Sequence, residues 1–131
     1  MKRLKVLIVD DSVAMRKIIV RTLEQTGLAV SEIVTACNGL EALLEVEKGD
    51  VDLVLSDIDM PIMDGLEFLK RIANLEVAKS PPVIMITTVG SQARVVEALH
   101  DGAKGYIRKP FTAEQVREKL TSLLPGAWTT S

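Results

Sequence analysis

Short apolar runs recur along the chain and predict buried strands. The clearest runs occupy residues 6–9, 51–56 and 83–87, and weaker ones lie near 30–35 and 105–108. Runs of this length with little polar alternation are typical of parallel strands that are buried on both faces of a sheet. The pattern therefore predicts five strands.

Helix-length segments with apolar residues at three- and four-residue spacing separate these runs. Taken helix by helix, the residues with this spacing are Met15, Ile18, Ile19 and Leu23; Leu40, Leu43 and Leu44; Leu66, Leu69 and Ala73; Val95, Val96 and Leu99; and Val116, Leu120 and Leu123. Ser12, Ser91 and Thr112 can cap helix starts, and Thr112 forms a capping-box pair with Gln115. The alternation predicts a doubly wound α/β fold, in which a mostly parallel five-stranded sheet carries helices on both faces.

Length and composition fit one globular domain. The chain has 131 residues, of which 47% are hydrophobic and 26% are charged. These values are ordinary for a folded protein and too apolar for a disordered one. Because the periodicity stops after Leu124, we expect the domain to span residues 1–124 and residues 125–131 to form a short C-terminal tail.

The distribution of charge argues against nucleic acid as a direct partner. The 16 basic and 18 acidic side chains give a net charge of −2, and they form no basic stripe along the sequence.

The single Cys37 cannot form an internal disulfide and has no zinc-ligand spacing. The N-terminal apolar stretch is too short for a signal peptide or a membrane span. We therefore expect a cytoplasmic protein that does not contact a membrane.

Chemically reactive side chains follow the predicted strands. Asp10 and Asp11 end the first strand, Asp57 ends the third, Thr87 ends the fourth, and the fifth runs into Lys109. The carboxyl ends of parallel strands meet at one edge of the sheet, where ligands bind in doubly wound folds. The sequence therefore predicts a single pocket with three carboxylates, a hydroxyl and an ammonium group.

Such a pocket needs a cation. Two carboxylates about 4 Å apart repel by about 4 kcal/mol at an effective dielectric constant of about 20. Magnesium prefers oxygen ligands and binds through one or two carboxylates together with a phosphate oxygen, which suits Asp10, Asp11 and Asp57. Calcium is disfavoured because the sequence has no EF-hand loop. With Lys109 also neutralising charge, a carboxylate can attack phosphorus and become an acyl phosphate, and Asp57 is best placed for this role.

Four motifs resemble those of bacterial two-component response-regulator receiver domains. They are Val-Asp-Asp-Ser at 9–12, Ser-Asp-Ile-Asp-Met-Pro-Ile-Met-Asp-Gly at 56–65, Ile-Thr-Thr at 86–88 and Lys-Pro-Phe at 109–111. Each is weak evidence alone, but their order and spacing on the alternating pattern are specific. The resemblance covers about residues 4–124, and it implies a flavodoxin-like (βα)5 fold with strand order 2-1-3-4-5.

The resemblance also implies roles for the acidic residues. Asp57 would accept the phosphoryl group from a sensor histidine kinase. Asp10 and Asp11 would bind magnesium directly or through water, with Asp57 as a further ligand and the backbone carbonyl of Asp59 completing the shell. Asp59 and Val89 occupy positions at which family members carry different residues. The residues at these positions affect how long the acyl phosphate lasts. We expect the Asp59 carboxylate to tighten metal binding.

Three further residues would respond to phosphorylation. Thr87 would donate its hydroxyl to the phosphoryl oxygens, Lys109 would contact the same group, and Tyr106 occupies the aromatic switch position of the family. The bond from Lys109 to Pro110 is expected to be cis. If Thr87 and Lys109 each contribute roughly 1.5–3 kcal/mol, together they approach the roughly 5.5 kcal/mol that inverts a 1:99 population.

The implied function is a phosphorylation-activated response regulator and not a turnover enzyme. The run Ser-Val-Ala-Met-Arg-Lys-Ile at 12–18 is similar to chemotaxis-type regulators, whose output is protein–protein binding. The expected partner surface comprises the fourth helix, the fifth strand and the last helix, with Arg94, Glu97, Tyr106 and Glu118. The chain would be a monomer or a phosphorylation-dependent dimer.

Other functions compete with this interpretation. A phosphorelay intermediate or the detached regulatory half of a transcription factor would use the same site. A haloacid-dehalogenase-like phosphatase would use Asp57 and Asp59 as its Asp-x-Asp pair. That class places the pair on its first strand with further acids far downstream, whereas here the acidic pair comes first. The order of the motifs therefore favours the receiver interpretation.

Overall fold

The computed structural model describes residues 3–75, 80–88 and 92–124, and strands and helices alternate along these ranges. The strands are β1 (Leu4–Val9), β2 (Val30–Ala36), β3 (Leu53–Asp57), β4 (Val83–Thr87) and β5 (Gly105–Arg108). The helices are α1 (Val13–Gln25), α2 (Gly39–Glu47), α3 (Gly65–Ala73), α4 (Gln92–His100) and α5 (Ala113–Thr121). The predicted tail at 125–131 and the proposed cap Ser91 lie outside the described residues.

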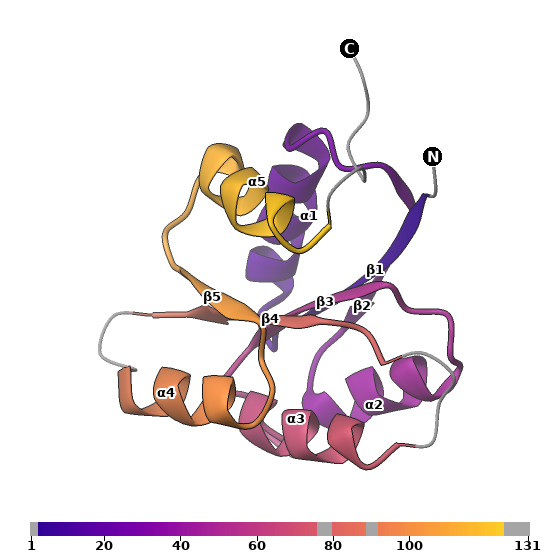
Figure 1. The fold of residues 1–131 in the computed structure, drawn as a ribbon, viewed down its shortest axis with the longest axis vertical. Coiled ribbons are helices and arrows are strands. Elements are labelled where there is room, and N and C mark those ends of the chain that lie inside the picture. The colour runs from indigo at the N-terminus through magenta and orange to yellow at the C-terminus, as the bar shows by residue number, and fades with distance from the viewer. Residues whose placement is uncertain (1–2, 76–79, 89–91, 125–131) are drawn as a thin grey trace.

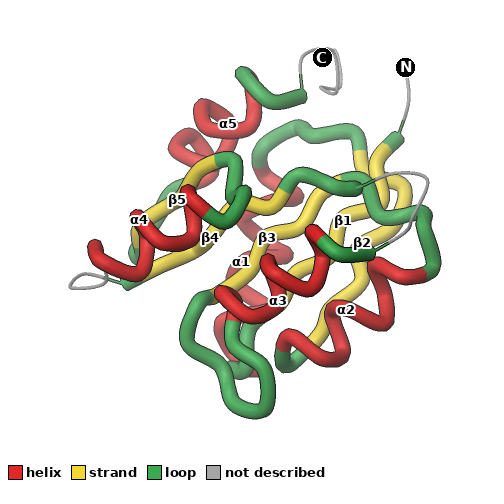
Figure 2. The backbone as a smooth tube through the Cα atoms, turned by 60° about the horizontal axis from the view of Figure 1, so that its bottom comes forward, coloured by secondary structure: helices red, strands yellow, loops and turns green. Residues whose placement is uncertain are grey.

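All strand pairs in the sheet are parallel, and the strand order is β2-β1-β3-β4-β5. This confirms the flavodoxin-like order 2-1-3-4-5. Figure 1 shows α1 and α5 on one face of the sheet and α2, α3 and α4 on the other. Figure 2 shows these last three helices side by side. The carboxyl ends of β1, β3, β4 and β5 therefore share one edge, as the alternation predicts.

The sheet separates two hydrophobic cores. Alternate residues of a strand point to opposite faces, so Leu7 and Val9 of β1 enter one core while Val6 and Ile8 enter the other. Phe68 of α3 is fully buried in the first core, and Leu120 of α5 is fully buried in the second. Burial on both faces explains why the strands read as continuous apolar runs.

Polar caps fix where the helices begin. Ser12 accepts a hydrogen bond from the Met15 N–H at 3.1 Å, which confirms it as the cap of α1. Thr112 and Gln115 form the predicted capping box at α5. Asn38 and Asp64 cap α2 and α3 in the same manner. The caps fix the residue at which each helix starts, directly after the strand ends that carry the reactive side chains.

Several of the apolar residues with helical spacing do not lie on the buried faces of the helices. Ile18, Leu40, Leu44, Val96 and Leu99 are exposed, with Val96 retaining 66% of its accessible surface. The buried faces of α2 and α4 include alanines that are fully buried, namely Ala42 beside Leu43 and Val46 in α2, and Ala98 beside Val95 in α4. Small residues allow a helix to approach the sheet closely, so the buried stripe is rotated relative to the stripe that the larger residues predict.

Several strand boundaries differ from the prediction by one or two residues. β3 begins at Leu53 and not at residue 51, while β2 extends to Ala36. Asp52, in the approach to β3, is buried and accepts a hydrogen bond from the Lys5 backbone N–H at 2.8 Å. The segment before β3 is therefore joined to β1 by this carboxylate as well as by backbone hydrogen bonds.

Candidate functional site

Asp10 is the buried anchor of the site. It follows β1 and is only 1% exposed. Its Oδ1 accepts the Ser12 backbone N–H at 2.9 Å, and its backbone carbonyl accepts a hydrogen bond from the Arg16 guanidinium at 2.6 Å. The Asp10 side chain is therefore held in place from the first turn of α1. Arg16 was not predicted as a site residue, although it lies one helical turn beyond Ser12.

Lys109 joins Asp10 to Asp57. The Lys109 Nζ lies 3.1 Å from Asp10 Oδ2 and 3.5 Å from Asp57 Oδ2. The Asp57 Oδ1 accepts the Ile58 backbone N–H at 2.8 Å. The Lys109 backbone N–H donates to the Thr87 carbonyl at 2.7 Å, and the peptide bond from Lys109 to Pro110 is cis, as predicted. One ammonium group therefore contacts two carboxylates at the edge of the sheet and offsets only part of their charge.

Asp11 completes a cluster of three carboxylates. Asp10, Asp11 and Asp57 each have an oxygen within 4.8 Å of an oxygen of the other two. Asp10 is buried, Asp57 is half-buried and Asp11 is exposed, so the cluster opens to solvent on one side. A set of carboxylate oxygens around an open position suits a hard divalent cation. The residues present therefore fit the predicted metal ion.

Burial raises the pKa of the Asp57 carboxyl group above its ordinary value. The charge of Lys109 lowers this pKa, whereas the charge of Asp10 raises it further, and burial is the largest of these effects. Keeping Asp57 ionised in the folded protein therefore costs folding free energy, unless a second cation binds beside Lys109. A group in this state is typical of functional sites.

Asp57→Asn is expected to stabilise the metal-free protein at pH 7 by on the order of 1 kcal/mol. Because the pKa of Asp57 is raised on folding, its ionised form costs stability at pH values above the folded pKa. This cost disappears as the pH falls through that pKa, so the two proteins should converge toward about pH 4. Urea unfolding of both proteins with a chelator, compared with the exposed Asp11→Asn, checks this. A less stable Asp57→Asn protein at pH 7 would contradict it.

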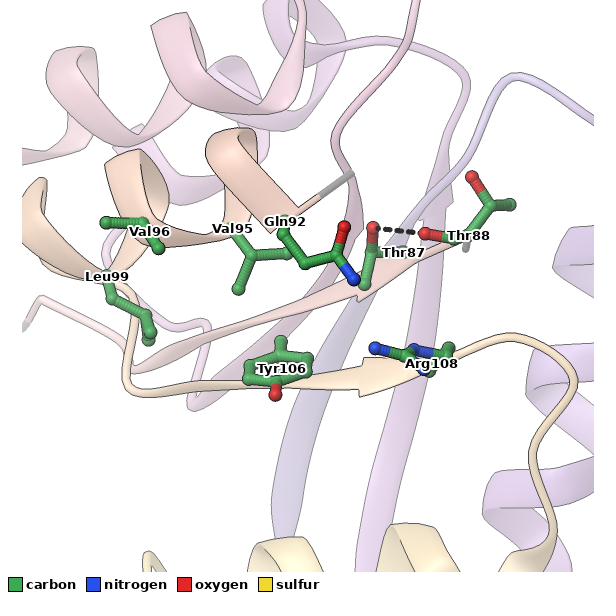
Figure 3. A pocket seen from close by; sticks show the side chains of 8 residues that line it. All are labelled: Thr87, Thr88, Gln92, Val95, Val96, Leu99, Tyr106 and Arg108. Carbon is green, nitrogen blue, oxygen red and sulfur yellow. Dashed lines mark hydrogen bonds between the residues drawn. The ribbon is translucent and has the colours of Figure 1, made fainter. Parts of the chain in front are cut away.

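Thr87 lies between the acidic cluster and an apolar groove. It is buried, and its Oγ1 donates to the Thr88 carbonyl at 3.2 Å. Thr87 and Tyr106 are among the residues that line a groove of about 180 Å³ between α4 and β5. Figure 3 shows Tyr106 on β5 below Val95 of α4, with Thr87 farther along β4. Tyr106 is partly exposed, and the Lys119 Nζ lies 5.6 Å from the centre of its ring. Thr87 and Tyr106 thus line one groove, and their switch roles stay predictions.

The side chain of Asp59 lies outside the carboxylate cluster. It is 59% exposed and forms an ion pair with Arg94 of α4. Arg94 also pairs with Asp64 Oδ2 at 2.9 Å. This bridge was not predicted, because no sequence pattern indicates a contact between residues so far apart in the chain. Val89, the other residue expected to affect the acyl phosphate lifetime, lies outside the described residues.

Among the described residues, no helix is long and apolar enough to cross a membrane.

Comparisons with known proteins identify the family. A model described as the response regulator receiver domain matches residues 6–121. The chain is 42% identical over 122 residues to the chemotaxis protein CheY-3 of Vibrio cholerae serotype O1, covering 93% of this chain and 92% of that protein. This family match, together with an acidic pair directly after β1 and Asp57 at the end of β3, favours a receiver over a haloacid-dehalogenase-like phosphatase.

Solved structures agree with this assignment. The chemotaxis response regulator CheY4 of Vibrio cholerae has a TM-score of 0.80 at 36% identity, covering 94% of this chain and 100% of that chain. The CheX-CheY-BeF3-Mg complex from Borrelia burgdorferi gives a TM-score of 0.79 at 34% identity, with coverages of 92% and 88%. The fold, the motifs and the family match lead to one conclusion. This chain belongs to the response regulator receiver domain family.

Proposed function

We propose that this chain is a phosphorylation-activated response regulator that accepts a phosphoryl group on Asp57 from a sensor histidine kinase. The observation that carries the proposal is the position of the Asp57 carboxylate, which lies beside Lys109 and within the cluster of three acids. Phosphoryl transfer depends mainly on positioning and on neutralising charge on the phosphoryl oxygens. Lys109 and a divalent cation held by the three carboxylates would do both.

Asp10, Asp11 and Asp57 would hold magnesium, with the backbone carbonyl of Asp59 as a further ligand. The metal would supply positive charge that draws the carboxylates and the phosphoryl oxygens together. Asp10 is fixed by the Ser12 N–H and by Lys109, so it would give the cluster a rigid reference point. Exposed Asp11 would complete the ligands from the solvent side.

In the transfer step, an Asp57 oxygen would attack phosphorus while the phosphorus–nitrogen bond of the donor phosphohistidine breaks. The electron pair of that bond would return to the imidazole nitrogen, and the acyl phosphate would form on Asp57. Lys109 would move from its contact with Asp57 to the new phosphoryl oxygens. Attack of water on phosphorus would later release phosphate and restore the carboxylate. The protein would thus be a switch that resets itself and not a turnover enzyme.

Thr87 would transmit the change to the surface. Its hydroxyl donates a hydrogen bond to the Thr88 carbonyl at 3.2 Å, which is long for an O–H donor. A phosphoryl oxygen could replace this carbonyl as the acceptor. A charged acceptor gives a stronger hydrogen bond than a neutral carbonyl. Rotation of Thr87 toward Asp57 would change the end of the groove that Tyr106 lines, and Tyr106 would then occupy a different position.

The output would be binding of a protein partner, of the chemotaxis type. Curated relatives at about 40% identity carry chemotaxis names, and one related structure is a complex with CheX. The proposed partner surface is formed by α4, β5 and α5 and includes Glu97, Tyr106 and Glu118. Arg94, also expected there, directs its guanidinium to Asp59 and Asp64. The proposal further places the receiver domain at residues 1–124 and the protein in the cytoplasm.

Acetyl phosphate labelling tests the proposal. The protein is incubated with acetyl phosphate, with magnesium or with a chelator, and weighed intact by mass spectrometry. We expect a gain of one phosphoryl group that requires magnesium and is absent from Asp57→Asn. Labelling that persists in the chelator, or no labelling of the wild-type protein under any condition, would contradict the proposal.

A further inference from the structure

One arginine connects α4 to the loop that follows the proposed phosphoacceptor. The guanidinium of Arg94 pairs with Asp59 Oδ1 and, at 2.9 Å, with Asp64 Oδ2. Asp64 is the cap of α3, and its Oδ1 accepts the Glu67 backbone N–H at 2.9 Å. Arg94 therefore holds the exposed carboxylate of Asp59 against the carboxylate of Asp64, which already caps a helix.

The backbone beside Asp59 is held by a loop hydrogen bond, whereas the Asp59 side chain is exposed. The Gly65 N–H donates to the Ile58 carbonyl at 2.7 Å, which closes the loop beside Asp57. The Asp59 side chain is 59% exposed, and Arg94 is its ion-pair partner in the described structure. Asp59 lies two residues from Asp57, yet the described carboxylate cluster contains only Asp10, Asp11 and Asp57. A fourth carboxylate is therefore close to the cluster in sequence and is held outside it.

We propose that Arg94 is a positioning residue that holds the Asp59 carboxylate outside the acidic pocket and neutralises its charge. This inference rests on the proposed function of that pocket. When the bridge opens, Asp59 turns toward the pocket, and its negative charge strengthens the binding of a divalent cation there. The expected effect of Asp59 on metal binding is thus conditional on Arg94.

The energetics of the bridge allow it to open. Pairs between exposed side chains are individually weak. A guanidinium with two carboxylates in its fork is better ordered than a single pair, but all three side chains remain more than a third exposed. The bridge can therefore break without unfolding the domain.

The position of Arg94 in α4 couples this bridge to the groove. Val95 and Val96 follow Arg94 directly, and both line the groove that contains Tyr106 and Thr87. A partner that moves α4 would therefore also move the guanidinium relative to Asp59. By thermodynamic linkage, a partner that opens the bridge would tighten cation binding, and the cation would favour that partner to the same degree.

A double-mutant cycle tests the inference. Magnesium affinity is measured by isothermal titration calorimetry for the wild type, Arg94→Gln, Asp59→Asn and the double variant, and thermal unfolding confirms that each is folded. We expect Arg94→Gln to tighten magnesium binding about fivefold in the wild-type background and less than about twofold in the Asp59→Asn background. The acyl phosphate lifetime, measured by mass spectrometry, should change in the same background-dependent way.

Arg71→Gln is the matched control. It removes the same charge from α3, where Arg71 pairs with Glu67 at 2.9 Å, away from Asp59. Arg94→Lys keeps the charge but loses the fork and should lie between the wild type and Arg94→Gln. Equal tightening by Arg94→Gln in both backgrounds, or no more tightening than by Arg71→Gln, would overturn the inference. A wild type that binds no magnesium and gains no phosphoryl group would overturn the proposed function as well.

Discussion

Gly65→Ala is expected to destabilise the domain by about 3 kcal/mol or more and to abolish labelling of Asp57 by acetyl phosphate. An alanine Cβ at this position would clash with the backbone carbonyl oxygen of Asp57 and would lie 2.9 Å from the Ile58 Cα. Both are backbone atoms beside the phosphoacceptor, so neither can rotate away. The loop would have to move, and the hydrogen bond from Gly65 to Ile58 would be lost with it.

Gly105→Ala provides the control for this prediction. Its Cβ would lie 3.3 Å from Lys119 Cδ, near the flexible end of a long side chain. We expect this variant to retain phosphorylation and most of its stability. Urea unfolding and intact mass measurements on both variants compare a backbone clash with a side-chain contact. Equal stability of the two variants would show that the close approach of Gly65 to Asp57 is unimportant.

Lys109→Met is expected to lower the free energy of unfolding by about 3 kcal/mol when magnesium is chelated. Its ammonium lies 3.1 Å from Asp10 Oδ2, and Asp10 is almost fully buried. Methionine would leave Asp10 and Asp57 close together without the cation that balances them. Removing one partner of a buried ion pair costs more than the pair contributes, because the remaining charge stays buried.

Magnesium distinguishes this explanation from simple loss of packing. A metal that binds between the carboxylates should recover part of the stability of Lys109→Met, and the gain should exceed that of the wild type. Lys70→Met, on the exposed side of α3, should change little under either condition. Unfolding curves with magnesium and with a chelator provide the comparison. A loss of stability that magnesium does not relieve would contradict an electrostatic cause.

Much of the fold was predictable because local patterns and global architecture agree. Continuous apolar strands such as β4 require burial on both faces, and the helices between them can then only cover the sheet. The caps Ser12 and Thr112 follow from local hydrogen bonding alone. The grouping of Asp10, Asp57 and Lys109 follows from the shared edge of a parallel sheet. The strand order itself required the family resemblance.

What the pattern did not predict depends on packing in three dimensions. Ala42 and Ala98 are fully buried, whereas Leu44 and Val96 are exposed although they have helical spacing, and an alanine gives little hydrophobic signal in a sequence. The bridge from Arg94 to Asp59 joins residues 35 positions apart on separate elements. Charges on helices are usually solvated, and nothing in their spacing identifies the few that pair across elements.

The most direct measurement for the central claim identifies which carboxylate carries the phosphoryl group. After acetyl phosphate treatment with magnesium, borohydride reduces an aspartyl phosphate to homoserine, and peptide mass spectrometry locates the modified residue. We predict homoserine at position 57 alone. Homoserine at position 10 or 11, or unmodified aspartate at 57 in a protein that gained a phosphoryl group, would contradict the assignment of Asp57 as the phosphoacceptor.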